Sequence, residues 1–247
     1  MGQPTAATPP ASRRLTQLSS LPLLVFGLFL FALGIVLTLH SGLGLGPWDV
    51  LHQGLSEQIG LTFGQTSILV GGVLVVLTVL LGERPGLGTV LNMLLIGLFI
   101  DLIRSTGLVP YAVSHGFALR LGMDCAGVGT VGVGSALYIK AGFGAGPRDS
   151  LMLALRRLTG VRVGVARTCI EVTALVTGYL LGGTVGLGTA VFALGIGPAV
   201  DLAFRAFNVH AHTSRPEPSA TARRTAARGS PRSGGGPHAA GTAPGDD

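Results

Sequence analysis

The chain has 247 residues, of which 48% are hydrophobic and only 11% are charged, with a formal net charge of +6. Its mean hydropathy is +0.61. A soluble domain carries about 25% charged residues, so this composition excludes an ordinary soluble fold. Several windows of about 18 to 20 residues are nearly free of charge, which is typical of transmembrane helices. The 40 glycines suit membrane helices that pack closely.

The chain opens with a polar segment, residues 1–20, which includes Arg13 and Arg14. We expect this segment to be a cytoplasmic tail. The first apolar stretch, Leu21–Leu39, is long, and its glycines recur later in the chain at the same spacing. An element repeated within the protein is structural, so we predict an uncleaved transmembrane span here and not a signal peptide.

A Gly-x-Gly-x-Gly-Pro-x-Asp segment follows this span. Proline at the first helical position and an acid in the first turn mark the start of a helix. The predicted helix, Asp49–Ile59, is about 15–18 Å long at about 1.5 Å per residue. That length is about half the hydrocarbon thickness of a bilayer. We therefore expect either a re-entrant half-helix or an amphipathic helix lying at the interface. The candidate site residues of the segment are Gly44, Gly46, Pro47 and Asp49.

Two further spans, Thr66–Leu81 and Leu87–Ile103, complete the predicted first membrane repeat, residues 21–104. Asp101 lies near the end of the last span, where an acid opposes the helix dipole and needs a partner. We expect it to pair with Arg104. The alternative is a role in gating or in holding the start of a facing helix.

The second half repeats the first at a constant offset of 100 residues, after a connecting loop at residues 105–120. This second repeat covers residues 121–207. Asp201, the counterpart of Asp101, is expected to pair with Arg205. The matching candidate site residues are Gly144, Gly146, Pro147 and Asp149. The predicted spans are Leu121–Ile139, Val165–Leu181 and Leu187–Phe204, and the predicted short helix is Asp149–Leu158.

Lys and Arg placement predicts how the two halves insert. The loop at 40–63 has neither residue, whereas its counterpart at 140–164 carries Lys140, Arg148, Arg156, Arg157 and Arg162. Three spans per half is an odd number, so matching loops must lie on opposite sides of the membrane. The sequence thus predicts an all-α polytopic membrane protein with six transmembrane helices as two inverted three-helix repeats, each with a short re-entrant or interfacial helix. Both termini are expected in the cytoplasm.

The basic segment at residues 208–247 is rich in Ala, Gly, Ser and Pro, and we predict a disordered cytoplasmic tail. We expect a solvated tail that fixes the orientation of the protein in the membrane, and its basic residues are compatible with contact with anionic lipid. No aromatic residues are interleaved with its arginines, so nucleic acid is not an expected partner.

The differences between the halves point to chemistry. Glu171 lies inside the predicted fifth span, where an ionisable group is a functional-site hypothesis by default. It can bind a cation, a proton or a cationic substrate. The alternative is structural pairing with Arg167, four residues earlier. Arg148 replaces Trp48 of the first half. We expect Trp48 to be an interfacial anchor and Arg148 to follow the positive-inside bias, with a phosphate or carboxylate contact as the alternative.

The two repeated helix starts can bind an anion, because their first N–H groups lack partners within the helix. The alternative is that the acids only satisfy their own helices and that the glycines permit a tight turn. His40 and His52 are expected to be solvated. No enzyme constellation, cofactor motif or metal-ligand spacing is visible, so neither catalysis nor a cofactor is expected.

The run Gly-Leu-Gly-Pro-Trp-Asp-Val-Leu-His-Gln-Gly-Leu-Ser at 44–56, followed by Gly-Leu-Thr-Phe-Gly at 60–64, resembles the YczE branch of the YczE/YyaS/YitT family of bacterial integral membrane proteins. Gly-Thr-Val-Leu-Asn at 88–92 and the Gly97/Asp101 pair fit this family too. The resemblance covers residues 20–207. It implies a multi-span protein of the bacterial inner membrane, and it implies no settled activity.

Our first functional hypothesis is a small-solute transporter or permease-like protein with its site between the halves. A passive channel with re-entrant half-helices is the second. The third is a membrane accessory or scaffold protein for a cytoplasmic enzyme. The expected partners are the lipid bilayer and a small-molecule or ion substrate, and a homo-oligomer is compatible with the sequence.

Overall fold

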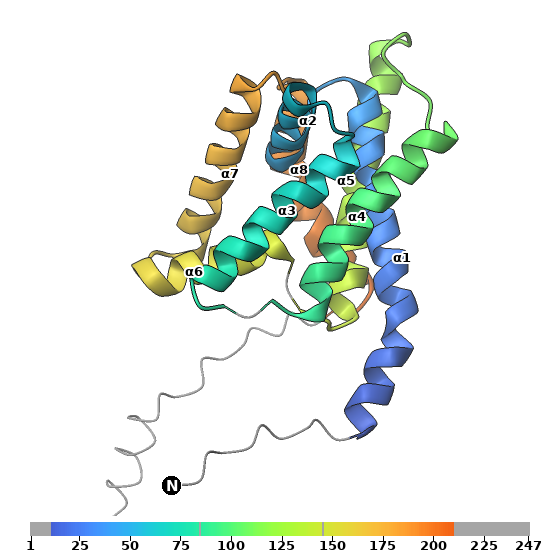
Figure 1. The fold of residues 1–247 in the computed structure, drawn as a ribbon. Coiled ribbons are helices and arrows are strands. Elements are labelled where there is room, and N and C mark those ends of the chain that lie inside the picture. The colour runs from blue at the N-terminus through green and yellow to red at the C-terminus, as the bar shows by residue number, and fades with distance from the viewer. Residues whose placement is uncertain (1–10, 84, 145, 210–247) are drawn as a thin grey trace, which may run out of the picture. The chain divides into compact units, whose positions relative to one another are not determined.

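The computed structural model describes residues 11–83, 85–144 and 146–209, and side chains from residue 19 onward. The predicted N-terminal tail, residues 1–20, and the predicted C-terminal tail, residues 208–247, lie partly outside this range. Within it the chain forms eight α-helices and no strand (Figure 1). They are α1 (Ala11–Ser41), α2 (Pro47–Ile59), α3 (Phe63–Leu80), α4 (Leu87–Thr106), α5 (Phe117–Lys140), α6 (Pro147–Thr159), α7 (Val163–Leu180) and α8 (Leu187–Ala206).

Each predicted span and each predicted short helix is present as a helix. α1 starts at Ala11, earlier than the predicted Leu21. The short helices α2 and α6 have 13 residues each and both begin at a proline. Both end at a glycine in the left-handed conformation, Gly60 with φ 69° and Gly160 with φ 70°. The matched turns explain why the glycines recur at the same offset, since a side chain disfavours this backbone conformation.

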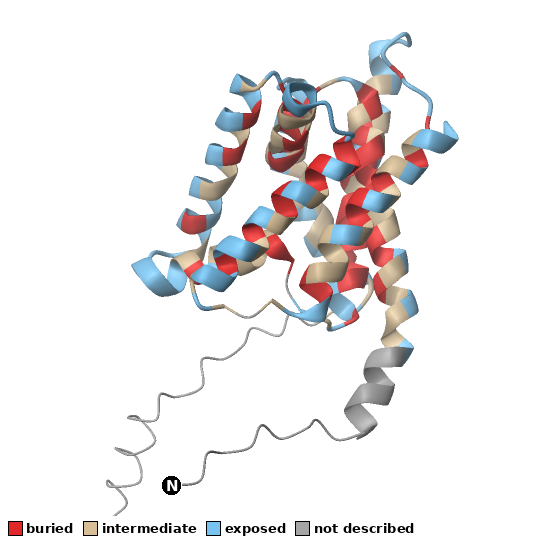
Figure 2. Ribbon diagram, in the orientation of Figure 1, coloured by how far each residue is buried: buried red, intermediate tan, exposed pale blue. Residues whose placement is uncertain are grey.

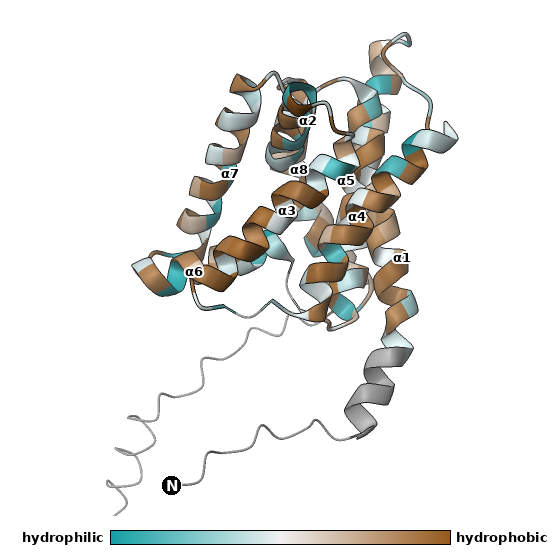
Figure 3. Ribbon diagram, in the orientation of Figure 1, coloured by the Kyte–Doolittle hydropathy of each residue, from teal (hydrophilic) through white to brown (hydrophobic). Residues whose placement is uncertain are grey.

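Five helices are long and apolar enough to cross a membrane: α1 from Ser19 onward, α3, α4, α7 and α8. Their outer faces expose large apolar side chains, as lipid contact requires (Figures 2 and 3). α5 has 24 residues, but its glycines and Asp124 lower its hydropathy. The predicted span Leu121–Ile139, which lies within α5, therefore stays a prediction. Examples of the exposed side chains are Leu69, Val73, Val76, Leu94, Leu98, Val172, Val176, Leu194 and Leu202.

α1 and α5 pack against each other through glycines at repeat-matched positions. A Cβ added at Gly34 would lie 2.7 Å from the carbonyl oxygen of Gly127, and one added at Gly134 would lie 2.7 Å from that of Gly27. The contacts ascend α1 as they descend α5, so the two helices run antiparallel. Gly127 and Gly134 of α5 therefore pack closely against α1, whereas Gly129 faces open space.

The short helices lie against the opposite half of the chain: α2 packs on α7, and α6 packs on α3. The approach of α2 is tight, because a Cβ added at Gly54 would lie 2.4 Å from the carbonyl oxygen of Gly178. The loop before each short helix also contacts the opposite half of the chain. The N–H of Gly188 donates to the carbonyl of Leu43 at 2.8 Å, and the N–H of Gly88 donates to that of Phe143 at 3.0 Å.

Candidate functional site

A cavity of about 220 Å³ lies where the two halves meet, and all eight helices contribute to its wall. Both repeated helix starts line it, from Gly46 to Asp49 and from Gly146 to Asp149. Arg167 and Glu171 of α7 line it as well. Most of the candidate binding residues predicted from the sequence thus surround one cavity. Gly44 and Gly144 do not, and they instead form the turns with φ 115° and 113°.

Both helix starts reach the cavity without a side-chain cap. Gly46 and Gly146 are the N-cap residues, with extended backbone, and neither can offer a capping side chain. A Cβ at Gly46 would lie 2.8 Å from the ring of Phe192, so close packing requires glycine here. The proline that follows lacks an N–H. In α2 the N–H of Asp49 donates to the carbonyl of Gly46 at 2.9 Å, so the first turn is partly satisfied. The aligned peptide dipoles still give each helix a partial positive end at the cavity.

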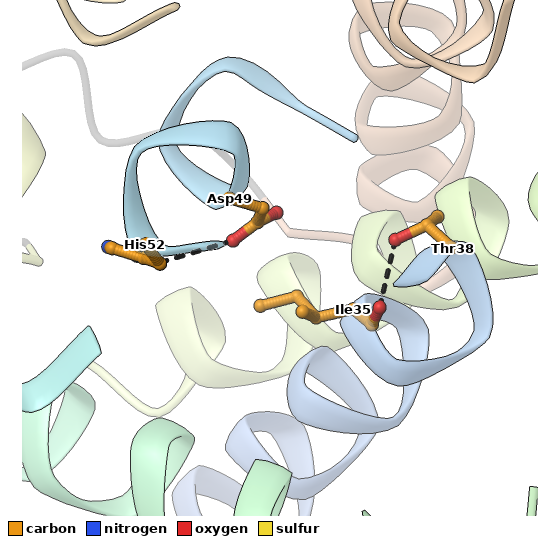
Figure 4. A network of polar contacts seen from close by, with 4 residues as sticks. All are labelled: Ile35, Thr38, Asp49 and His52. Carbon is orange, nitrogen blue, oxygen red and sulfur yellow. Dashed lines mark hydrogen bonds and ion pairs between the residues drawn. The ribbon is translucent and has the colours of Figure 1, made fainter. Parts of the chain in front are cut away.

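Asp49 and His52 form a buried polar pair on one face of α2 (Figure 4). Oδ1 of Asp49 lies 3.4 Å from Nδ1 of His52, and the side chains are 4% and 2% exposed. Neither atom has a hydrogen-bond partner among the described residues. Figure 4 also shows the neighbouring turn of α1, where the Thr38 hydroxyl donates to the Ile35 carbonyl at 2.9 Å.

The expectation of solvated histidines is wrong. His52 is buried against the cavity, and His40 is 2% exposed. Nδ1 of His40 lies 2.8 Å from the carbonyl oxygen of Val109, and its ring stacks on Tyr111. The connecting loop therefore folds over the end of α1. For His52 the sequence held a signal, because spacing of three residues places it beside Asp49 on a helix.

Trp48 and Arg148, which occupy matching positions in the repeat, lie against each other. The guanidinium carbon of Arg148 is 4.9 Å from the centre of the Trp48 ring. Trp48 is only 8% exposed, so its expected role as an interfacial anchor is wrong. In the described part of the chain, Arg148 forms no hydrogen bond and no ion pair. Its charge is balanced at longer range by Asp49 and Asp149. The positive-inside bias alone does not account for this placement.

Glu171 pairs with Arg167, as the structural alternative expected, whereas its binding of a cation, a proton or a cationic substrate stays a prediction. Its Oε1 accepts a hydrogen bond from Nε of Arg167 at 2.9 Å, as the spacing of four residues predicted. Both side chains also line the cavity. The pair therefore forms part of the cavity wall.

Asp101 and Asp201 lie outside the cavity and differ from each other. Asp101 accepts a hydrogen bond from the N–H of Gly64 at 2.9 Å, and the Thr62 hydroxyl donates to its other oxygen. The expected pairing with Arg104 is absent from the described ion pairs, because the carboxylate instead holds the start of α3. Asp201 does pair as expected, with Nη2 of Arg205 at 2.7 Å on the surface.

Sequence reasoning missed Asp124, a fully buried acid in α5. The hydroxyl of Ser41 donates to its Oδ1 at 3.2 Å, whereas Oδ2 has no hydrogen-bond partner in the described structure. Its signal was a lone acid inside a glycine-rich apolar stretch. No group of three or more His, Cys, Asp or Glu side chains that could hold a metal ion occurs among the described residues.

The chain is similar to proteins whose roles are not established. A family model described as "Family of unknown function (DUF6198)" matches residues 18–205. An uncharacterised membrane protein of Bacillus subtilis, YczE, is 39% identical over 68% of this chain and 77% of its own length. An uncharacterised protein of Haemophilus influenzae is 36% identical over 74% and 83%. The uncharacterised protein YyaS of Bacillus subtilis is 32% identical over 66% and 81%. No solved structure matches the chain.

Proposed function

The chain belongs to the YczE/YyaS family of membrane proteins, and from this premise we propose that it is a transporter for a small solute. The transporter has six spans arranged as two inverted repeats in a bacterial inner membrane, with both termini in the cytoplasm. The solute crosses through the cavity between the repeats. The observation that carries the proposal is the convergence of both Gly-Pro-x-Asp helix starts on that single cavity.

Reciprocal packing supports the inverted arrangement. Gly27 meets Gly134 and Gly34 meets Gly127, so each repeat-matched pair is exchanged between antiparallel helices. Such exchange is the pattern of contacts around a two-fold axis. An axis lying in the membrane plane relates the halves of many transporters. In this arrangement α5 is also a membrane span, and Asp124 is buried among neighbouring helices together with Gly127, Gly132 and Gly134.

The burial pattern of α2 favours a re-entrant helix over an interfacial one. α6 buries only Pro147 and Ala154 among its described residues, so the same assignment for α6 rests on its match to α2 in the repeat. An interfacial helix keeps its polar face in water. α2 instead buries Asp49 and His52 together with Val50 and Gly54. At about 20 Å, a helix of 13 residues ends within a bilayer that is about 30 Å thick. Its N-terminus then lies at depth, where a half-helix can bind a charged group of a substrate.

Accessibility of the cavity from both sides of the membrane tests transport without knowledge of the solute. Ser135 of α5 lines the cavity and is 8% exposed. We replace it by cysteine after changing the native Cys125 and Cys169 to alanine. A charged, membrane-impermeant thiol reagent is then added to right-side-out and to inside-out membrane vesicles. Alternating access predicts modification of Ser135→Cys in both preparations.

The matched control is Leu194→Cys, which is 79% exposed on α8 and faces lipid in this account. It should remain unmodified in both preparations. Failure of the reagent to reach Ser135→Cys from either side would contradict a transport pathway and leave an accessory role. Deleting residues 210–247 addresses that role directly, because a transporter retains its accessibility pattern without the tail.

Glutathione trapped inside the vesicles distinguishes a passive channel from a transporter. A channel open to both sides lets the reagent pass, so the trapped thiol is consumed. A transporter exposes the cavity to one side at a time, so the glutathione persists while Ser135→Cys reacts.

A further inference from the structure

Some charged side chains around the cavity have no hydrogen-bonded partner of opposite charge among the described residues. Three carboxylates line it, those of Asp49, Asp149 and Glu171, together with the guanidinium groups of Arg148 and Arg167. Arg167 and Glu171 pair with each other at 2.9 Å. Arg148 therefore faces two remaining carboxylates. A charge away from water is costly when it has no close partner. A ligand that carries both a negative and a positive group can supply a partner to Arg148 and to the two aspartates.

The positive part of the cavity is prepared for a carboxylate. The guanidinium carbon of Arg148 lies 4.9 Å from the centre of the Trp48 ring, and the guanidinium N–H donors have no hydrogen-bond acceptor among the described residues. A guanidinium fork matches the two oxygens of a carboxylate. The uncapped starts of α2 and α6 add partial positive charge at the same cavity.

The negative part is prepared for a cationic donor. Oδ1 of Asp49 is buried and lacks a hydrogen-bond partner among the described residues, with only the His52 ring nitrogen at 3.4 Å. Asp149, at the matching position of α6, also lines the cavity and forms no described ion pair. An ammonium group has three N–H donors and no acceptor, so it can donate to more than one carboxylate of the cavity wall.

We propose that the cavity binds a small aliphatic amino acid in its zwitterionic form, with the carboxylate on Arg148 and the ammonium on Asp49 and Asp149. A simple anion would add a third negative charge beside the two aspartates. A simple cation would leave Arg148 without an acceptor. The inference rests on the proposed function and names the solute class for the same cavity.

The size and the remaining wall fit a short apolar substituent. The volume of about 220 Å³ lies below the range of about 300–1,000 Å³ that drug-sized ligands occupy. Aliphatic side chains supply much of the wall, among them Val70, Ile96, Val131, Ile170 and Ile196. These contacts favour alanine, valine or leucine over amino acids with polar or aromatic side chains.

Isothermal titration calorimetry of the full chain in detergent tests the proposal, first with the twenty standard amino acids. Valine is then compared with isovalerate, which lacks the amine, and with isobutylamine, which lacks the carboxylate. We expect each single-charge analogue to bind at least about tenfold more weakly than valine, which is about 1.4 kcal/mol. The same comparison applies to alanine, propionate and ethylamine.

Variants assign the two charges. Arg148→Gln should abolish valine binding, and Arg148→Lys should weaken it because the fork is lost. Asp49→Asn should reduce the ratio of the affinity for valine to the affinity for isovalerate. Arg156→Gln, an exposed site on α6, is the control and should bind valine as the wild type does. Size-exclusion profiles identify any variant that fails to fold. If Arg148→Gln fails to fold, the valine affinity of Arg148→Lys is compared with that of the wild type instead.

Binding of isovalerate as tight as that of valine would overturn the proposal, as would the absence of binding by all twenty amino acids. These outcomes are separable from the test of transport. If Ser135→Cys reacts from both sides and no amino acid binds, the cavity transports another class of solute. If valine binds and Ser135→Cys reacts from neither side, the zwitterion site stands without transport.

Discussion

The carboxylates of Asp101 and Asp201 occupy matching positions but perform different structural tasks. Asp101 joins the end of α4 to the start of α3 through Gly64 and Thr62. Asp201 pairs only with Arg205, four residues away on an exposed helix face. A hydrogen bond to a charged acceptor that joins two helices contributes more to stability than an exposed ion pair within one helix.

We therefore predict that Asp101→Ala lowers the free energy of unfolding by about 1–2 kcal/mol, allowing for partial exposure. Asp201→Ala should change it by less than about 0.5 kcal/mol. Denaturant unfolding of each variant in the same detergent measures the difference. Equal losses in the two variants would show that the Asp101 contact to α3 contributes nothing beyond a surface charge.

Local spacing predicts residues whose partners are one helical turn away, and it fails where the partner is distant in sequence. The pairs Arg167–Glu171 and Asp201–Arg205 follow from a spacing of four. The stacking of Arg148 on Trp48 depends on how two halves of the chain fold together. Nothing in the sequence near either residue specifies that contact.

At the scale of elements, glycine positions determine how closely α1 and α5 approach. A Cβ at Gly127 would lie 2.7 Å from Cγ2 of Thr38 and 2.8 Å from the carbonyl oxygen of Gly34, whereas nothing lies within 4 Å of one at Gly129. Both glycines are on α5, two residues apart, so they form a matched pair for a test of packing.

Gly127→Ala should lower the free energy of unfolding by about 1–3 kcal/mol, because the added methyl forces the helices apart. Gly129→Ala should leave it unchanged or raise it slightly, since alanine is the better helix former. Thermal unfolding in detergent, followed by circular dichroism, measures both. A stability for Gly127→Ala equal to that of Gly129→Ala would contradict the close approach of α1 and α5.

Helix positions were predictable because apolar runs and Gly or Pro punctuation are local signals. The short helices begin at Pro47 and Pro147, and the predicted starts at Asp49 and Asp149 lie two residues later. The exchange of α2 and α6 between halves was not predictable. Both short helices carry similar apolar faces, so the pattern alone permits packing on either half.

At the scale of the whole molecule, the proposed transport function depends on two copies of one unit that are inserted in opposite directions. The exchanged contacts of α1 with α5, and of the short helices with α7 and α3, follow from that arrangement. So does the single cavity that both helix starts reach. The sequence predicted this arrangement from repeat spacing and charge and placed a site between the halves, but it could not show which charged groups of that site lack a close partner.

The measurement that tests the central claim most directly is the sidedness of Leu61 and Val161. They lie at matching positions after α2 and α6 and are 40% and 37% exposed. Each is changed to cysteine in the cysteine-free background and treated with an impermeant thiol reagent in spheroplasts. We predict that Leu61→Cys reacts in intact spheroplasts and that Val161→Cys reacts only after lysis. Reaction of both cysteines from the same side would contradict the inverted repeat and the solute pathway built on it.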